Sequence, residues 1–165
     1  MKISTPLENI DKTDLQILDH LQRDGRLSVV DLAKRVNLSP TPCTARIRKL
    51  EEAGVIKGYH AELDPLKMGQ ALMVFVTVKL RGTDEATLEK FNAAVKPIEP
   101  ILECHMVGGG FDYLLKIRVR DMSEYREILG GVIGRLPMVE GTHSYFVMED
   151  VKDTGQLPIL RVYKK

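Results

Sequence analysis

The spacing of apolar residues changes once along this chain, and that change constrains the possible folds more than any other feature. Up to about residue 53, apolar side chains recur at intervals of three and four, which is typical of amphipathic helices. Over residues 72–80 leucine and valine occupy every second position, which is typical of a strand with one buried face. The sequence therefore predicts an α+β chain with a helical domain at 1–62, a linker containing proline and glycine at 63–71, and a mixed domain at 72–165.

Three short helices are predicted in the first domain. The first covers about residues 11–23 behind Asp11 as its N-cap, the second follows Ser28, and the third begins at Pro40, where a missing N–H is tolerated. Only about three residues separate the second helix from the third, which is the layout of a helix-turn-helix. Such a module inserts its later helix into the major groove, so the sequence predicts binding to double-stranded DNA.

The third predicted helix has one face that packs and one that is presented. At about 100° per residue, Cys43, Ile47 and Leu50 fall together, and the opposite side carries small and hydroxyl-bearing residues. Small side chains let the helix axis enter a major groove that is about 12 Å wide. The predicted DNA-binding residues are Ser39, Thr41, Pro42, Thr44, Ala45, Arg46, Arg48 and Lys49.

Two arginines of this helix have different predicted roles. Arg48 lies on the presented side and is expected to reach either a guanine edge or a phosphate. Arg46 lies nearer the packed side, and it is expected either to contact a phosphate or to pair with an acidic side chain of the same chain. Between Lys34 and Leu50 there are five basic residues and no acidic one, so positive charge is concentrated at the turn and the third helix.

The second domain is predicted to follow the order β-α-β-β-α-β, which is the ferredoxin-like pattern. The predicted strands lie at 72–80, 101–107, 113–119 and 142–151. The first of its two helices begins behind Thr83 or Asp84, and the second begins behind Asp121 and is ended by Pro137. Both helices are expected to cover one face of a four-stranded antiparallel sheet.

The other face of this sheet is expected to be uncovered. Met73, Phe75 and Phe146 are predicted on it, beside the polar residues Thr77 and Lys116. Monomers rarely leave an apolar patch larger than a few hundred Å² in water, so we expect self-association through this face. A two-fold dimer would also present two recognition helices to half-sites roughly 34 Å apart.

Three consecutive glycines, Gly108, Gly109 and Gly110, precede Asp112 at the turn between the second and third predicted strands. A hairpin turn that requires a positive φ accounts for one or two of them. A glycine turn also brings bare backbone N–H groups to the surface, where they can hold a carboxylate. Since Asp112 can pair with an ammonium group, two interpretations stay open: a turn alone, or a site for an α-amino acid.

Composition excludes several other classes of protein. The chain has 24 Lys+Arg and 23 Asp+Glu, so its total charge alone does not indicate a nucleic-acid partner. The charge is unevenly distributed, however, because residues 1–60 carry a net charge of +2 and residues 61–165 a net charge of −1. No signal-peptide pattern and no apolar run of about 18 residues is present, so we expect a cytoplasmic protein without membrane association. The two cysteines and four histidines show no metal-ligand spacing, and no nucleophile has a base partner. We therefore expect that the protein is not an enzyme and that it holds no metal ion or cofactor.

Five segments of the sequence carry a resemblance to a known family. They are Asp14-Leu-Gln-Ile-Leu18, Leu38-Ser-Pro-Thr-Pro-Cys-Thr-Ala-Arg-Ile-Arg-Lys-Leu-Glu51, Gly54-Val-Ile-Lys-Gly-Tyr59, Glu103-Cys-His-Met-Val-Gly-Gly-Gly-Phe-Asp-Tyr113 and Tyr145-Phe-Val-Met-Glu149. In one register over about residues 10–150, they resemble the Lrp/AsnC family of transcriptional regulators, and most closely its bacterial leucine-responsive members.

This resemblance implies a winged helix-turn-helix that binds DNA, a ferredoxin-like domain that senses an amino acid, and homodimers that assemble into octamers or larger rings. It also implies an effector held between dimers, near the hairpin turn of one sensing domain and its neighbour. The implied effector-binding residues are Met106, Gly108, Gly109, Gly110, Asp112, Met122, Tyr145, Phe146 and Val147. Gly110 and Phe146 depart from the polar residue and the valine that are usual there, while the methionines indicate an apolar pocket.

These observations predict a sequence-specific transcriptional regulator that responds to leucine or another apolar amino acid. One alternative is an architectural DNA-binding protein without an effector, in which the glycines form only a turn. Another is a small-molecule enzyme on the ferredoxin-like sheet, but the chain offers it no acid, base or nucleophile set.

Overall fold

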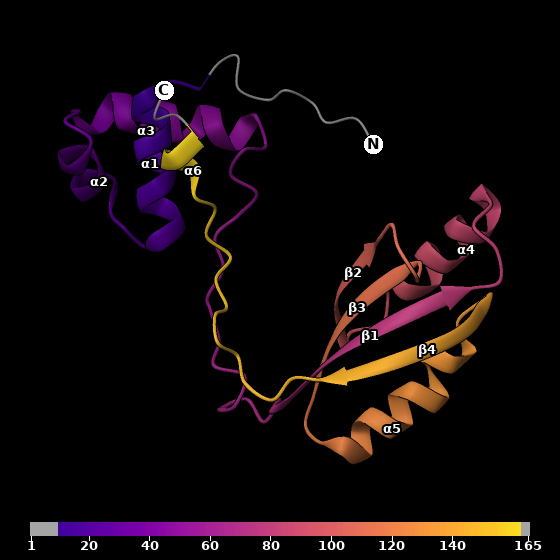
Figure 1. Ribbon diagram of the computed structural model, residues 1–165. Coiled ribbons are helices and arrows are strands. Elements are labelled where there is room, and N and C mark those ends of the chain that lie inside the picture. The colour runs from indigo at the N-terminus through magenta and orange to yellow at the C-terminus, as the bar shows by residue number, and fades with distance from the viewer. Residues whose placement is uncertain (1–9, 163–165) are drawn as a thin grey trace. The chain divides into compact units, whose positions relative to one another are not determined.

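The chain folds into two compact units. A computed structural model describes residues 10–162, and it groups the described parts of Met1–Glu62 and Asp153–Lys165 into one unit and Leu63–Lys152 into the other (Figure 1). We call these the helical unit and the sheet unit. The sheet unit differs from the predicted domain 72–165 in two ways, because it includes the predicted linker and because the chain leaves it after Lys152.

Capped helices at the predicted positions build the helical unit. They are α1 at Lys12–Arg23, α2 at Val29–Arg35 and α3 at Pro40–Glu52. Asp11 and Asp14 form a reciprocal capping box at the start of α1, in which each side chain accepts a hydrogen bond from the other residue's backbone N–H. The Ser28 hydroxyl caps α2 by accepting from the N–H of Asp31 at 3.1 Å.

A small core holds these three helices together. Its buried members are Ile17, Leu32, Ala33, Val36, Cys43 and Leu50. Cys43 and Leu50 come from the predicted packing face of α3, and Ile47 packs beside them, so that prediction is confirmed. Burial raises the pKa of the Cys43 thiol, which therefore acts as a small apolar side chain.

The C-terminal segment packs against α1. A short helix that was not predicted, α6 at Ile159–Val162, lies in contact with α1 (Figure 1). The side-chain amide of Gln22 donates to the carbonyl oxygen of Leu157 at 2.9 Å and accepts from the N–H of Leu157 at 2.9 Å. This pair of hydrogen bonds helps to hold the end of the described chain on the helical unit.

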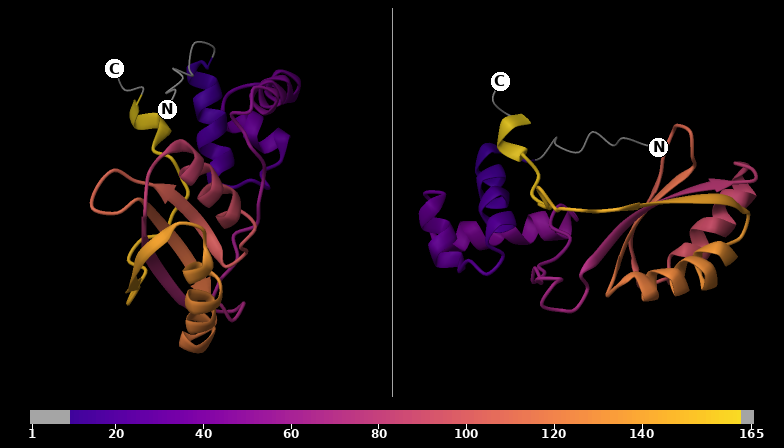
Figure 2. Two further views of the ribbon diagram at one scale, coloured as in Figure 1. Left: turned by 90° about the vertical axis from the view of Figure 1, so that its right-hand side faces the viewer. Right: turned by 60° about the horizontal axis from the view of Figure 1, so that its bottom comes forward.

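The sheet unit has the predicted ferredoxin-like topology. Its strands are β1 at Leu72–Leu80, β2 at Ile101–Met106, β3 at Tyr113–Val119 and β4 at Val139–Phe146. They pair antiparallel in the order β2-β3-β1-β4. Helices α4 at Glu85–Val95 and α5 at Met122–Gly131 cover the same face of the sheet (Figure 2). The two crossovers and this strand order confirm the prediction.

Alternate residues of β1 and β3 form the core beneath the two helices. Val74, Val76 and Val78 of β1 are fully buried there. From α4, the ring of Phe91 lies against that of Tyr113 in β3, with centroids 4.3 Å apart. Tyr113 opens β3, so this packing supports the end of the sheet from which the β2–β3 hairpin projects.

Two elements near the end of the sheet unit differ from prediction. Helix α5 stops at Gly131 and is followed by a 3₁₀ turn at Ile133–Arg135, whereas the sequence predicted one helix ending at a proline. The glycine pair that ends α5 explains this, because each glycine costs a helix about 1 kcal/mol relative to alanine. Strand β4 begins and ends earlier than the predicted strand 142–151. No helix within the described residues is long and apolar enough to cross a membrane.

DNA-binding face and candidate effector site

The side of α3 that faces away from the core carries most of the predicted DNA contacts. Its exposed residues are Thr41, Pro42, Thr44, Ala45, Arg48 and Lys49. Ser39 is the N-cap and is exposed, but its side chain makes no capping hydrogen bond. The Thr44 hydroxyl donates to the carbonyl oxygen of Pro40 at 2.9 Å. Seven of the eight predicted residues are thus open to a ligand, and Arg46 is the exception.

Within residues 10–162, the side-chain partner of Arg48 is a neighbour on the same helix. Its Nε donates to a carboxylate oxygen of Glu52 at 2.7 Å, and the two side chains are 77 % and 64 % exposed. An exposed pair of this kind contributes about 0.3–0.5 kcal/mol. A base edge or a phosphate can therefore displace Glu52 at small cost.

Arg48→Ala is expected to weaken binding to a specific DNA site by about 1–3 kcal/mol if the guanidinium reads a base edge. Fluorescence anisotropy with a selected site and with a random duplex, at one salt concentration, measures the effect. Arg126→Ala, at an exposed position of α5, is the matched control and should change neither affinity. An equal loss on both duplexes would assign Arg48 to a phosphate.

Arg46 points toward α1 instead of away from the protein. Its Nη1 lies 2.6 Å from Oδ2 of Asp11 and 2.8 Å from Oδ1 of Asp14. Of the two predicted roles, the structure shows the intramolecular pair. Hydrogen bonds from the Asp14 N–H and from Arg46 hold the pKa of Asp11 below its ordinary value. Asp14 was missed as a partner, although an acidic residue among the inward-facing positions of α1 was a signal for it.

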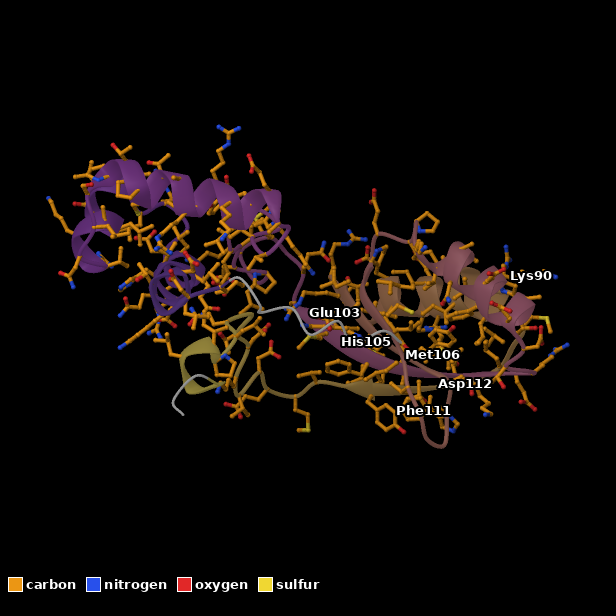
Figure 3. The ribbon with its side chains drawn as sticks, turned by 90° about the horizontal axis from the view of Figure 1, so that it is seen from above. Lys90, Glu103, His105, Met106, Phe111 and Asp112 are labelled. Atoms are coloured by element: carbon orange, nitrogen blue, oxygen red, sulfur yellow. The ribbon has the colours of Figure 1, made fainter. Side chains whose placement is uncertain are left out.

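Asp112, the predicted ammonium partner, is buried beside the β2–β3 hairpin (Figure 3). Its Oδ2 accepts from the N–H of Leu80 at 2.8 Å, and its Oδ1 accepts from Nζ of Lys79 at 3.2 Å. The bond from Leu80, assisted by Lys79, keeps the pKa of Asp112 below its ordinary value. The carboxylate is therefore ionised, and it ties the hairpin to the end of β1.

The glycine triplet does not have the backbone conformation predicted for it. None of Gly108, Gly109 and Gly110 has a positive φ, so the expectation of a left-handed turn is wrong. Apart from its chain neighbours, a Cβ placed on any of the three would meet no atom of the described residues within 4 Å. Neither backbone conformation nor space inside this chain requires glycine here. The exposed backbone of this turn is open to close approach by a ligand or another chain.

The predicted effector residues form two separate groups on the sheet unit. Met106, Gly108–Gly110 and Asp112 gather at the hairpin, and we call them the hairpin group (Figure 3). Met122 follows the far end of β3, and Tyr145–Val147 lie beside the start of β1, so we call these the β4 group. The β4 group begins level with Lys116, the middle residue of β3, so it lies three or more residues, or about 10 Å or more, from the hairpin end of that strand. Two strand spacings of about 4.8 Å also separate β4 from β3. One sheet unit therefore does not bring the two groups together.

The uncovered face of the sheet has an aromatic part. Phe75 and Tyr145 lie opposite each other there, and Tyr145 is 57 % exposed. Phe146 was predicted on this face, and that prediction is wrong. It lies opposite the core residue Val74 and packs edge-on against Tyr125 of α5, with ring centroids 5.4 Å apart.

The same face has a charged part on β2 and β3. Glu103 pairs with Lys116 at 3.1 Å and with His105 at 3.0 Å (Figure 3). These two partners hold the pKa of Glu103 below its ordinary value. Met73 was predicted to be exposed here but is buried, and Nη2 of Arg118 lies 3.6 Å from its sulfur atom. The uncovered face is thus less apolar than predicted.

Comparison with known proteins gives a family model for each of the two units. Residues 10–57 match the family model described as winged helix-turn-helix DNA-binding, and residues 73–157 match the one described as the Lrp/AsnC ligand binding domain. The chain belongs to the Lrp/AsnC family. It is a DNA-binding transcriptional regulator with an amino-acid-binding domain, and the predicted family and α+β fold are confirmed.

Relatives of this Lrp/AsnC regulator match along nearly their whole length. The leucine-responsive regulatory proteins of Escherichia coli K12 and Salmonella typhimurium LT2 are each 51 % identical to it over 93 % of this chain and 94 % of theirs. A Neisseria meningitidis transcriptional regulator in complex with L-methionine is 36 % identical, with a TM-score of 0.87 over 92 % of this chain and 98 % of that one. An AsnC family regulator of Agrobacterium tumefaciens is 37 % identical, with the same TM-score and coverage. These proteins are named as regulators, and this chain is a regulator and not an enzyme, as predicted.

Proposed function

We propose that this Lrp/AsnC regulator is a cytoplasmic protein whose binding to specific DNA responds to an apolar α-amino acid, with leucine as the first candidate. The observation that carries the proposal is the separation of the hairpin group from the β4 group, by three or more residues along the strands and by two strand spacings across the sheet. An effector that needs both groups finds a complete site only between two copies of the chain. Effector binding and assembly are then coupled.

The hairpin group supplies the polar half of this site. Backbone N–H groups at Gly108–Gly110 would hold the effector's carboxylate, and Asp112 would hold its ammonium group. An ionised carboxylate has about four acceptor positions, of which Leu80 and Lys79 occupy two. Asp112 can thus keep its structural bonds and accept from an ammonium group as well.

Met106, Met122 and Phe146 would supply the apolar half. All three are exposed in one copy of the chain, and methionine adapts its shape to a bound aliphatic group. The names of the 51 % identical relatives favour leucine, and the complex of the Neisseria meningitidis regulator favours methionine as the second candidate.

We propose homodimers that use the uncovered sheet face, where a second copy would cover Phe75 and Tyr145. Octamers or larger rings would then bring the hairpin group of one dimer to Met122, Phe146 and Val147 of the next, while Tyr145 contributes to the dimer interface. Each dimer would present two α3 helices to DNA half-sites roughly 34 Å apart. The effector would act by population shift, since it changes DNA binding only through different affinities for the assembly states.

Calorimetric titration of the full-length protein tests the chemistry of the site. Leucine and methionine are expected to bind, whereas 4-methylpentanoate, which lacks the ammonium group, and 3-methylbutylamine, which lacks the carboxylate, are not. Sedimentation with and without leucine reports whether assembly changes. Absence of binding by every amino acid in a full panel would favour the architectural DNA-binding protein.

A further inference from the structure

Arg46 joins the middle of α3 to the start of α1 through two carboxylates. Its Nη1 contacts both Asp11 and Asp14, and the Asp14 side chain is only 5 % exposed. The same two aspartates cap α1, since each accepts from the other's backbone N–H, at 2.9 and 3.1 Å. One guanidinium therefore fixes the beginning of α1 and the recognition helix to each other.

The surroundings of Arg46 disfavour a contact between its guanidinium and a DNA phosphate. Arg46 and the two aspartates line a shallow groove together with Pro42, Ala45 and Lys49. The two carboxylates more than neutralise the Arg46 guanidinium, and with Lys49 the groove as a whole carries no net charge, so it offers a DNA phosphate no excess of positive charge. Withdrawing Arg46 to a phosphate would also leave the buried Asp14 carboxylate without its cation, which is costly.

We propose that Arg46 is a positioning residue for DNA recognition, which sets the orientation of α3 on α1 and does not itself contact DNA. Cys43 and Leu50 fix one stripe of α3 on the core. Arg46 lies three residues after Cys43 and four before Leu50, so it is next to this stripe on the helix surface. Its ion pair with Asp11 adds a directional contact there. Base readout depends on this orientation, because each side chain must reach a base edge at hydrogen-bond distance.

Arg46→Ala is expected to weaken binding to specific DNA about tenfold or more and to change binding to random DNA by about twofold at most. The specific probe is a duplex that the wild-type full-length protein selects from random-sequence DNA, and the second probe is an unselected duplex of equal length. A misoriented α3 loses base contacts but keeps phosphate contacts, so the slope of log K against log salt should be unchanged. A phosphate contact would instead lower both affinities and reduce the slope by about one.

Asp14→Asn gives opposite results for the two roles. If Arg46 contacts a phosphate, removing a negative charge beside it releases the guanidinium and strengthens DNA binding. If Arg46 positions α3, the same change weakens the ion pair and reduces the affinity for the selected duplex severalfold. The double variant Arg46→Ala with Asp14→Asn should be no weaker than Arg46→Ala alone, because both changes remove one interaction.

Lys49→Ala is the matched control, since it removes a cation that lines the same groove but belongs to the predicted DNA contacts. It should lower the affinity for both duplexes and reduce the salt slope. Thermal melting by circular dichroism accompanies each variant, because a partly unfolded protein loses both affinities in equal proportion. A reduced salt slope for Arg46→Ala, an unchanged ratio of the two affinities, or tighter binding by Asp14→Asn would each overturn the proposal.

Discussion

Ile17→Ala is expected to lower the free energy of unfolding of the helical unit by about 2–5 kcal/mol and to abolish binding to specific DNA. Ile17 is fully buried in a core that has six buried members among residues 10–162, so the cavity has few neighbours to fill it. Domains of ordinary size are stable by only about 5–15 kcal/mol, and small units lie at the low end. Since this core holds α3, disrupting the core also disrupts the orientation of α3.

Urea denaturation followed by circular dichroism measures the loss of stability, and anisotropy with the selected duplex measures the loss of DNA binding. Val30→Ala is the matched control, because Val30 is 51 % exposed on α2. Its effect on the free energy of unfolding should stay within about 0.5 kcal/mol. Wild-type DNA affinity in Ile17→Ala would show that α3 does not depend on this core.

Asp112→Asn is expected to weaken leucine binding by about 1.5–3 kcal/mol, or roughly 10- to 150-fold, while leaving the fold intact. The amide oxygen of asparagine can still accept from the N–H of Leu80, but it no longer carries the charge that an ammonium group requires. Asp112→Ala should lose leucine binding too, and it should also destabilise the sheet unit by about 1–3 kcal/mol because the buried Leu80 N–H loses its acceptor.

Comparing the two variants separates the structural role of Asp112 from its proposed role in the effector site. Calorimetric titration with leucine gives the affinity, and denaturation gives the stability. Glu89→Gln, an acid-to-amide change at an exposed position of α4, should leave both unchanged. Wild-type leucine affinity in Asp112→Asn would remove Asp112 from the site.

The elements could be predicted where local signals were strong. Asp11, Ser28 and Pro40 mark the starts of the first three helices, and leucine or valine at every second position marks β1. The packing face of α3 followed from helical periodicity alone. The face of Phe146 could not be predicted, because β4 mixes polar and aromatic residues without alternation and a one-residue error moves a side chain to the opposite face.

Contacts between distant segments lay beyond the sequence patterns. Arg46 meets Asp14 across 32 positions, and Gln22 meets Leu157 across 135. In each case the sequence shows a side chain that can form an ion pair or hydrogen bonds, but the partner that it meets depends on how the helices pack. Asp112 was identified as a candidate from its place beside the glycines, yet its bond to the N–H of Leu80 depends on strand register.

The most direct test of an amino-acid-responsive regulator is a titration of the selected duplex with full-length protein, with and without saturating leucine. We expect the apparent Kd to change by about 1–3 kcal/mol, or roughly 5- to 150-fold, which is the usual size of allosteric coupling. Methionine should act similarly, and 4-methylpentanoate should have no effect. Superimposable binding curves with leucine, methionine and every other amino acid would contradict the proposed function.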